Sequence, residues 1–406
     1  MLGADFDYKP KRKYISHSPD ETIEFRNLTR FEGNRLNCVW SVDGVKASED
    51  WDFSTQLTPG EHVIKLTVRN GDITDSKLEN MEVDESGLSF PENQLNVRLK
   101  GIDFTPGFRD GAWKPLSEEQ MEEDLDVINR ELGCNAVRIF GDIDGLIIRC
   151  AEIALTKSFD CIVLAPRYID ATVEETVKRV GTFAEQAEKL RQSSHAVELC
   201  VANELSIEAL NLVPGGGGYE SRAFKANTAD WSLFNKVLTN LVAVSKKSFM
   251  GKISYSAGFW ESVNWSRLGF DVIGSNEYLW TTRMGSIESK LEQLKSFGKP
   301  IYVGEFGSCS YSGACKWGGA GWAYLDKGPY NEVEQKECIE KSYLKVFNRT
   351  RPDAVFLYVY KDWHERGFGI LSSPVENHIT SMAPYMGRWR RKLAFHLYEG
   401  YKRVGS

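Results

Sequence analysis

Two glutamates that follow apolar, strand-like runs are the first candidates for catalysis in this chain. The run over residues 196–202 is mostly apolar and leads directly into Asn203 and Glu204. A run of the same design over residues 300–304 leads into Glu305. A buried strand that delivers a carboxylate at its carboxyl end is how a parallel α/β barrel presents a catalytic acid.

Two carboxylates on one site can cleave a glycosidic bond. One protonates the leaving oxygen while the other attacks the anomeric carbon, and in a retaining enzyme the two groups stand about 5–5.5 Å apart. The acid needs a raised pKa, whereas the nucleophile must stay ionised. Arg138 belongs to another strand-like run, at residues 136–140. It is placed to keep Glu305 charged, although it could pair with any neighbouring acid.

The elements that must position these residues form a repeating pattern beyond residue 92. Short apolar segments alternate with amphipathic helical segments, as in parallel βα units. We expect eight strands, at residues 96–103, 136–140, 161–166, 197–202, 252–257, 270–275, 300–305 and 354–360. The clearest helical patterns cover residues 117–132, 172–191, 231–248 and 332–348, and Ser117 with Gln120 predicts a capping box.

Eight such strands predict a (β/α)8 TIM barrel over residues 92–406. A doubly wound open sheet is the alternative, but its first strand would usually be followed by a Gly-rich phosphate turn. The segment that follows the first predicted strand, Phe104-Thr105-Pro106-Gly107, is not such a turn.

Residues 1–88 have the sequence pattern of a small all-β domain. Apolar and polar residues alternate over residues 22–25, 36–42 and 62–68, with turn residues between them. This pattern predicts an antiparallel sandwich. The stretches 40–44 and 59–68 resemble immunoglobulin-like modules of the PKD type. A spacer or packing module is the preferred interpretation, with carbohydrate binding as the alternative.

In a barrel, the loops at the carboxyl ends of the strands build the site. The predicted strand ends there bring together Asp103, Arg138, Arg167, Tyr168, Asn203, Glu204, Asn276, Glu277, Tyr278, Glu305, Trp363 and His364. Seven of the eleven tryptophans fall in the same loops: Trp113, Trp260, Trp265, Trp280, Trp317, Trp322 and Trp363. Aromatic rings at a binding site suit sugars, whose C–H faces stack on aromatic planes, although two or three of these rings could plug the barrel mouth.

These residues resemble the clan A glycoside hydrolases, a large group of retaining β-glycosidases with (β/α)8 barrels. Asn203-Glu204 at the end of the fourth strand and Glu305 at the end of the seventh match the pattern of that clan. Arg138, Tyr278 and Trp363 also fall at positions that the clan uses. The resemblance covers roughly residues 95–400 and leaves out the sandwich.

The resemblance implies a role for each matching residue. Glu204 would be the acid/base and Glu305 the nucleophile, while Asn203 would hold the sugar 2-hydroxyl. Arg138 and Tyr278 would bind and tune Glu305, and Trp363 would form the floor of the subsite that holds the distorted sugar. Further expected substrate contacts are Asp103, Asn276 and Trp280.

One departure leaves the substrate open. Cellulase-like and mannanase-like members of the clan often carry a histidine two residues before the strand-six tyrosine, and this chain has Asn276 there. A non-catalytic carbohydrate-binding barrel remains the main alternative function. A metal-assisted hydrolase that uses Asp103, His364 or Glu277 is a third hypothesis.

Charge and composition exclude some classes of binding partner. The net charge of −7 argues against a nucleic-acid binder, and no apolar run is long enough to predict a membrane span. We expect no cofactor and no metal site, because the sequence has no CxxC pair or histidine cluster. The start of the chain does not resemble a signal peptide, so we expect a cytoplasmic protein or an extracellular one whose export segment is absent from this chain. Cys309 and Cys315 could form a local disulfide.

Overall fold

The computed structural model describes residues 2–13, 15–29, 36–84, 93–109, 113–278, 284–361, 364, 366–372 and 389–403. These residues divide into two compact units. One contains residues up to 84 together with 389–391, and the other contains residues 93–372 and 392–403. Trp280, Trp363 and the predicted boundary between residues 88 and 92 lie outside the described residues.

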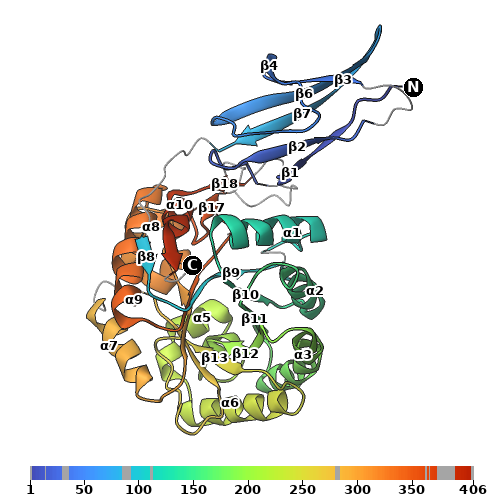
Figure 1. The fold of residues 1–406 in the computed structure, drawn as a ribbon. Coiled ribbons are helices and arrows are strands. Elements are labelled where there is room, and N and C mark those ends of the chain that lie inside the picture. The colour runs from blue at the N-terminus through green and yellow to red at the C-terminus, as the bar shows by residue number, and fades with distance from the viewer. Residues whose placement is uncertain are drawn as a thin grey trace. The chain divides into compact units, whose positions relative to one another are not determined.

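The larger unit is built on a closed barrel of eight parallel strands with helices around it (Figure 1). The strands follow one another around the barrel in chain order, and the last pairs with the first. They are β9 (Leu99–Phe104), β10 (Ala136–Gly141), β11 (Cys161–Pro166), β12 (Val197–Asn203), β13 (Ile253–Ala257), β14 (Val272–Asn276), β15 (Ile301–Phe306) and β16 (Ala354–Leu357). The prediction of a (β/α)8 TIM barrel is therefore confirmed, with every strand close to its expected position.

The helices of this unit also follow the predicted pattern. The main ones are α1 (Glu118–Asp126), α2 (Asp144–Ala154), α3 (Val173–Ser193), α6 (Trp231–Lys246), α7 (Met284–Lys295), α8 (Glu332–Cys338), α9 (Lys345–Thr350) and α10 (Leu393–Gly400). Two short helices, α4 (Leu205–Glu208) and α5 (Tyr219–Phe224), follow β12. Ser117 and Gln120 make both bonds of the predicted capping box at α1.

Shorter elements complete the larger unit. A π-helical turn at Val127–Glu131 extends α1, and another at Ile339–Leu344 joins α8 to α9. Residues Ala314–Lys327 form kinked 3-10 turns. Strand β8 (Asn93–Leu95) pairs with β19 (Tyr401–Arg403) in parallel, and β17 covers Leu371–Ser372. Within the described residues, no helix is both long and apolar enough to cross a membrane.

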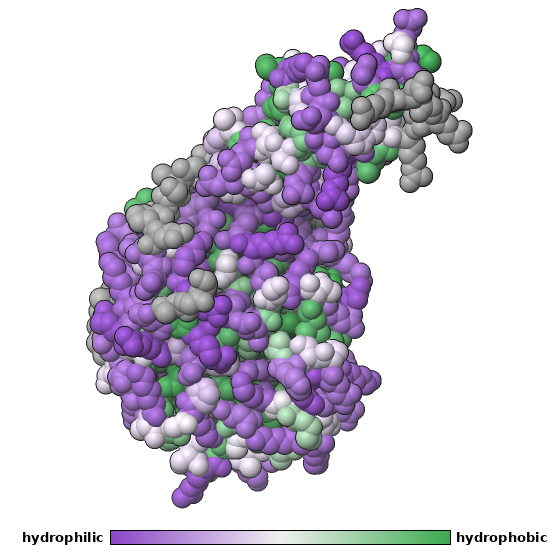
Figure 2. Space-filling model, in the orientation of Figure 1, coloured by the Kyte–Doolittle hydropathy of each residue, from purple (hydrophilic) through white to green (hydrophobic). Residues whose placement is uncertain are grey.

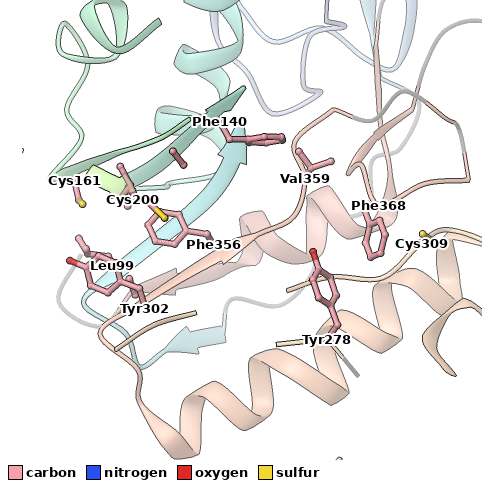
Figure 3. Packing of buried hydrophobic residues seen from close by; sticks show 14 of the residues in the cluster. Leu99, Phe140, Cys161, Cys200, Tyr278, Tyr302, Cys309, Phe356, Val359 and Phe368 are labelled. Carbon is pink, nitrogen blue, oxygen red and sulfur yellow. The ribbon is translucent and has the colours of Figure 1, made fainter. Parts of the chain in front are cut away.

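Side chains fill the interior of the barrel, so it is a packed core rather than a channel. Figure 3 shows Leu99, Cys161, Cys200, Tyr302 and Phe356 packed together among the strands. Gly101 makes room for the Phe356 ring, because a Cβ at that position would lie 2.5 Å from it. Space for a ligand at the carboxyl ends of the strands therefore lies beyond this core. The face shown in Figure 2 is mostly hydrophilic, with its apolar residues in small patches.

The smaller unit consists of two antiparallel sheets. One contains β1 (Phe6–Lys9), β2 (Ile23–Asn27) and β5 (Phe53–Thr55); the other contains β3 (Asn37–Val42), β4 (Val45–Ser48), β6 (Gly60–Asn70) and β7 (Ile73–Val83). Strand β18 (Arg390–Arg391) comes from near the end of the chain. Trp40 is fully buried, and its ring centroid lies 5.1 Å from that of Phe6 in the other sheet. This is the expected all-β module, while its PKD-type resemblance stays a prediction.

Candidate active site

Glu204 and Glu305 line the same cavity at the carboxyl ends of the barrel strands. Glu204 directly follows β12, and Glu305 is the penultimate residue of β15. The cavity has a volume of about 390 Å³, and its remaining wall comes from loops that follow several other strands. The structure therefore brings together the two carboxylates that the sequence singled out.

The backbone turns sharply at Glu204. Its φ of 40° and ψ of 45° lie in the left-handed region, which costs a residue other than glycine about 1–2 kcal/mol. The Glu204 amide donates to the carbonyl oxygen of Ser256 on β13 at 2.9 Å. A conformation of this kind persists only where its surroundings hold it in place.

Glu204 is 7% exposed, and its carboxyl group has a polar, uncharged neighbour. Asn276 at the end of β14 donates from Nδ2 to Glu204 Oε1 at 3.1 Å. Burial raises the pKa of Glu204 well above its usual range, and the nearby Glu305 carboxylate raises it further. The Arg167 guanidinium opposes this shift without cancelling it. Glu204 is therefore suited to carry a proton.

The Glu305 carboxylate has cationic neighbours instead. Tyr278 donates its hydroxyl to Oε2 at 3.0 Å, and Arg138 donates to Oε1 at 3.4 Å. The Arg167 guanidinium lies 3.9 Å from the same Oε1. Two guanidinium groups and a hydroxyl donor stabilise a negative charge at this position. Gly304 allows the close approach of β13, because a Cβ there would lie 2.3 Å from Ser256 Oγ.

A buried polar network lies behind the two carboxylates. Arg138 donates from Nη1 to Asp103 at 2.8 Å and from Nη2 to Asn203 Oδ1 at 2.8 Å. The same Asn203 oxygen also accepts from Asn276 at 3.1 Å. Glu305, Arg138, Asn203, Asn276 and Glu204 thus form a continuous chain of hydrogen bonds from one carboxylate to the other.

The same network contains two further expected substrate contacts. Asp103 and Asn276 are both fully buried and are not among the residues that line the cavity, so their contact with substrate stays a prediction. Burial raises the pKa of Asp103, while Arg138 opposes that shift. Arg138 and Asn203 are each 1% exposed and lie in the same layer, whereas Tyr278 lines the cavity.

Several residues of the cavity were not assigned a role from the sequence. Arg167 lines the wall beside Glu305 and forms a 2.6 Å ion pair with Glu208 of α4. Tyr219 and Tyr358 line the same wall. The position of Arg167 directly after β11 was a signal for its presence at this end of the barrel. Its pairing with Glu208 depends on the turn at Glu204, which sequence patterns do not show.

The loop after β15 supplies an aromatic wall. Trp317 stacks on Tyr324 with 4.2 Å between ring centroids, and Trp322 lies 6.0 Å from the Tyr219 ring. Trp260 lines this cavity too, and Trp113 lines an adjoining cavity of about 180 Å³. Trp265 packs against Tyr255 and Phe270 instead, as the alternative interpretation of some tryptophans allowed.

A disulfide anchors this aromatic loop. It joins Cys315 to Cys338 of α8, so the predicted pairing of Cys309 with Cys315 is wrong. Cys309 is fully buried in the apolar cluster that contains Tyr278 and Phe368 (Figure 3). Cys315 lies farther along the loop and is bonded to the last residue of α8. The short sequence separation favoured a bond between Cys309 and Cys315, but the fold places the two residues in different surroundings.

Glu277 points away from the cavity, as strand alternation predicts for the neighbour of Tyr278. Its carboxylate accepts from Ser275 Oγ at 2.6 Å and pairs with Lys290 of α7 at 3.0 Å. The strand-end glutamates thus fall into two groups, with Glu204 and Glu305 inside the cavity and Glu277 in the helix layer.

Comparison with known proteins shows the fold. No family model and no curated protein matches the chain. A GH113 β-1,4-mannanase structure is 16% identical with a TM-score of 0.50, covering 75% of this chain and 98% of that one. A β-glucuronidase from Parabacteroides merdae is 11% identical with a TM-score of 0.49, covering 98% of this chain and 52% of that one. A putative β-galactosidase from Bacteroides fragilis is 12% identical with a TM-score of 0.48, covering 98% of this chain and 60% of that one.

Proposed function

We propose that the larger unit is a retaining β-glycosidase in which Glu204 is the acid/base and Glu305 is the nucleophile. The observation that carries this proposal is the contrast between two carboxylates on one cavity. One is buried beside an amide and has a raised pKa, while the other accepts bonds from a tyrosine and a guanidinium. Glycoside cleavage by double displacement requires this division of roles.

The first step uses both carboxylates. A Glu305 oxygen attacks the anomeric carbon, the glycosidic C–O bond breaks, and Glu204 transfers its proton to the departing oxygen. In the second step Glu204, now ionised, takes a proton from water while that water attacks the same carbon and releases Glu305. Both carboxyl groups return to their starting protonation states, and the sugar keeps its β configuration.

The buried network serves this chemistry indirectly. Arg138 stabilises charge on Glu305 and orients Asn203, and Asp103 accepts a hydrogen bond that holds the Arg138 guanidinium in place. Asn203 remains the candidate ligand for the sugar 2-hydroxyl, because it precedes Glu204 in the chain. Tyr358 is proposed to form part of the sugar-binding floor, since it lines the cavity at the end of the last barrel strand.

The wall beside the proposed acid favours an apolar leaving group. The segments after β12 and β13 contribute Ile207, Phe224, Phe259 and Trp260 to the cavity. A leaving group must lie on this side, because Glu204 protonates its oxygen. Aliphatic and aromatic surfaces, such as the edge-to-face Phe259–Trp260 pair with 4.9 Å between ring centroids, suit an apolar aglycone. We therefore propose β-glycosides with apolar aglycones as the substrate class.

The fold is compatible with this proposal but does not select the sugar, since one barrel fold hosts many activities. A β-1,4-mannanase uses a barrel of the same fold. The proposal for this chain depends on its own carboxylates and their neighbours.

Two isosteric substitutions test the proposal. Glu305→Gln should remove nearly all hydrolysis of a panel of aryl β-glycosides, and Glu204→Gln should remove nearly all hydrolysis of the members with poor leaving groups. Azide should rescue Glu305→Gly with inversion of the product. Glu277→Gln is a matched control, because Glu277 is also a buried strand-end carboxylate but faces Lys290. Wild-type rates in both Gln variants would overturn the proposal. Oligosaccharide binding by calorimetry without any product would instead indicate a non-catalytic carbohydrate-binding barrel.

A further inference from the structure

Glu261 has no role in the chemistry above, yet it lies in the loop that packs against the proposed acid. It follows β13 and Trp260, which lines the cavity. Its carboxylate accepts three hydrogen bonds: Oε1 from the Ser206 amide at 2.9 Å, and Oε2 from the Tyr255 hydroxyl at 2.5 Å and the Gly258 amide at 2.9 Å. All three partners are donors, so they satisfy an ionised carboxylate.

These bonds reach the backbone that directly follows the turn at Glu204. The Leu205 amide donates to the Tyr255 hydroxyl at 2.9 Å, and that hydroxyl in turn donates to Glu261. The Ser206 amide donates to Glu261 directly. With the Glu204 amide bound to the Ser256 carbonyl, three consecutive amides are fixed by β13 and the loop after it.

A side-chain contact adds to these three backbone bonds, and we call the whole set of contacts the clamp. Trp260 donates from Nε1 to Ser206 Oγ at 3.0 Å, so the ring that lines the cavity is tied to the segment that carries Glu204. The clamp thus joins the left-handed turn, the acid and part of the leaving-group wall. Without it, the strained turn at Glu204 would lose the contacts that hold it.

We propose that Glu261 is a positioning residue for Glu204, which holds the acid in its left-handed turn and favours the protonated acid through its own negative charge. This inference rests on the proposed glycosidase function. Glu261 does not reach the substrate in this arrangement, and it acts through the backbone of residues 204–206 and through the electric field at the Glu204 carboxyl group.

The charges around Glu204 agree with the second part of this role. The groups that act on it are Glu305 from β15, Arg167 from the end of β11, Asn276 from β14 and Glu261 from the loop after β13. Glu305 and Glu261 raise the pKa of Glu204, whereas Arg167 and Asn276 lower it. Burial raises the pKa of Glu261 itself to about 7, so its charge is present above neutral pH.

The test compares pH profiles of kcat/KM for the wild type, Glu261→Gln and Tyr255→Phe. Protonated Glu204 is the active form, so activity falls as pH rises through its pKa. Removing the Glu261 charge should move this alkaline limb to lower pH. Tyr255→Phe keeps the Glu261 carboxylate but deprives the Leu205 amide of its acceptor, so it should lower the rate and move the limb less than Glu261→Gln does.

A second readout separates positioning from general damage. Both variants should lose about tenfold or more on aryl glycosides with poor leaving groups, which need the acid, and much less on strongly activated ones. If Glu261→Gln does not fold, as judged by circular dichroism, the leaving-group dependence of Tyr255→Phe still decides the positioning claim.

Two outcomes would overturn the inference. One is an alkaline limb of Glu261→Gln at its wild-type position, and the other is an equal loss on poor and activated substrates in both variants. The Glu204→Gln variant keeps this failure distinct from failure of the proposed function. An inactive Glu204→Gln beside a wild-type-like Glu261→Gln would reject only the role of Glu261.

Discussion

The ends of strands β12 and β15 carry the same residue type at the same end of the barrel, yet they place it in opposite surroundings. Glu204 accepts a bond from an amide and lies near another acidic loop residue, Glu261. Glu305 accepts bonds from Tyr278 and Arg138 and lies near Arg167. The difference is created almost entirely by residues on other strands. A carboxylate's role in such a site therefore depends on its neighbours across the barrel more than on its own sequence context.

The strongest test of this contrast varies the leaving group. Glu204→Gln should lose about 10²–10⁴-fold on poor leaving groups, because general acid catalysis contributes that much, and should recover with a highly activated aryl leaving group. Glu305→Gln should be inactive on both, because no leaving group can replace the nucleophile. The ratio of kcat/KM values on the two substrates measures the difference directly. Equal behaviour of the two variants would remove the distinction between acid and nucleophile.

A second test weakens the surroundings of Glu305 alone. Tyr278→Phe removes one hydrogen bond to a charged group, which is worth about 1.5–3 kcal/mol, so kcat/KM should fall roughly tenfold to hundredfold. The chain offers a matched control in Tyr302→Phe. Tyr302 makes a similar tyrosine–glutamate bond, to Glu198 at 3.3 Å, but lies in the barrel core away from the cavity.

The control separates stability from catalysis. Both tyrosines are buried, so both variants should lose some stability. Only Tyr278→Phe should lose activity per folded molecule, measured after correction for the folded fraction. A comparable loss in Tyr302→Phe would mean that the Tyr278 effect reports packing.

Strand ends were the part of this site that sequence patterns could predict. Apolar runs followed by polar residues place Glu204, Glu305, Arg138 and Tyr278 at one end of a parallel barrel, because the strands of such a barrel all point the same way. The pattern does not show how deeply a strand-end side chain is buried below the cavity wall. Asp103 stands near a strand end as expected, yet it is fully buried and is hydrogen-bonded to Arg138 instead of lining the cavity.

Loop contacts were beyond prediction for a different reason. Glu261 binds a residue of another loop, and Cys338 of α8 is bonded to a loop residue; both partners are decided by how the loops fold onto the barrel. No periodicity links them to Ser206 or Cys315. The missed contacts are therefore those made between loops, while the predicted ones follow from strand direction.

The two carboxylates should also differ in how they affect stability. The pKa of Glu204 is raised in the folded protein, so its contribution to stability is fully present below the unfolded pKa and is lost as pH rises through the folded pKa. Glu204→Gln should therefore be more stable than the wild type at alkaline pH. Glu305→Gln should be less stable, because it leaves Arg138 and Arg167 without that partner. Urea unfolding at acid and alkaline pH measures both, and a Glu204→Gln variant that loses stability with pH as steeply as the wild type would contradict the assignment.

The smallest expected effect concerns the wall beside the acid. Phe224 is 64% exposed although it lines the cavity, so much of its ring surface is free to cover an apolar aglycone. Phe224→Ala should raise KM for aryl or alkyl glycosides by about threefold to tenfold, because part of one apolar side chain is lost from the contact. It should leave kcat nearly unchanged, since ground state and transition state lose the same contact. Leu233→Ala is a suitable control, because Leu233 is 39% exposed on α6 and is not among the residues that line the cavity. An unchanged KM for apolar glycosides, together with a raised KM for oligosaccharides, would show that this wall binds a sugar instead.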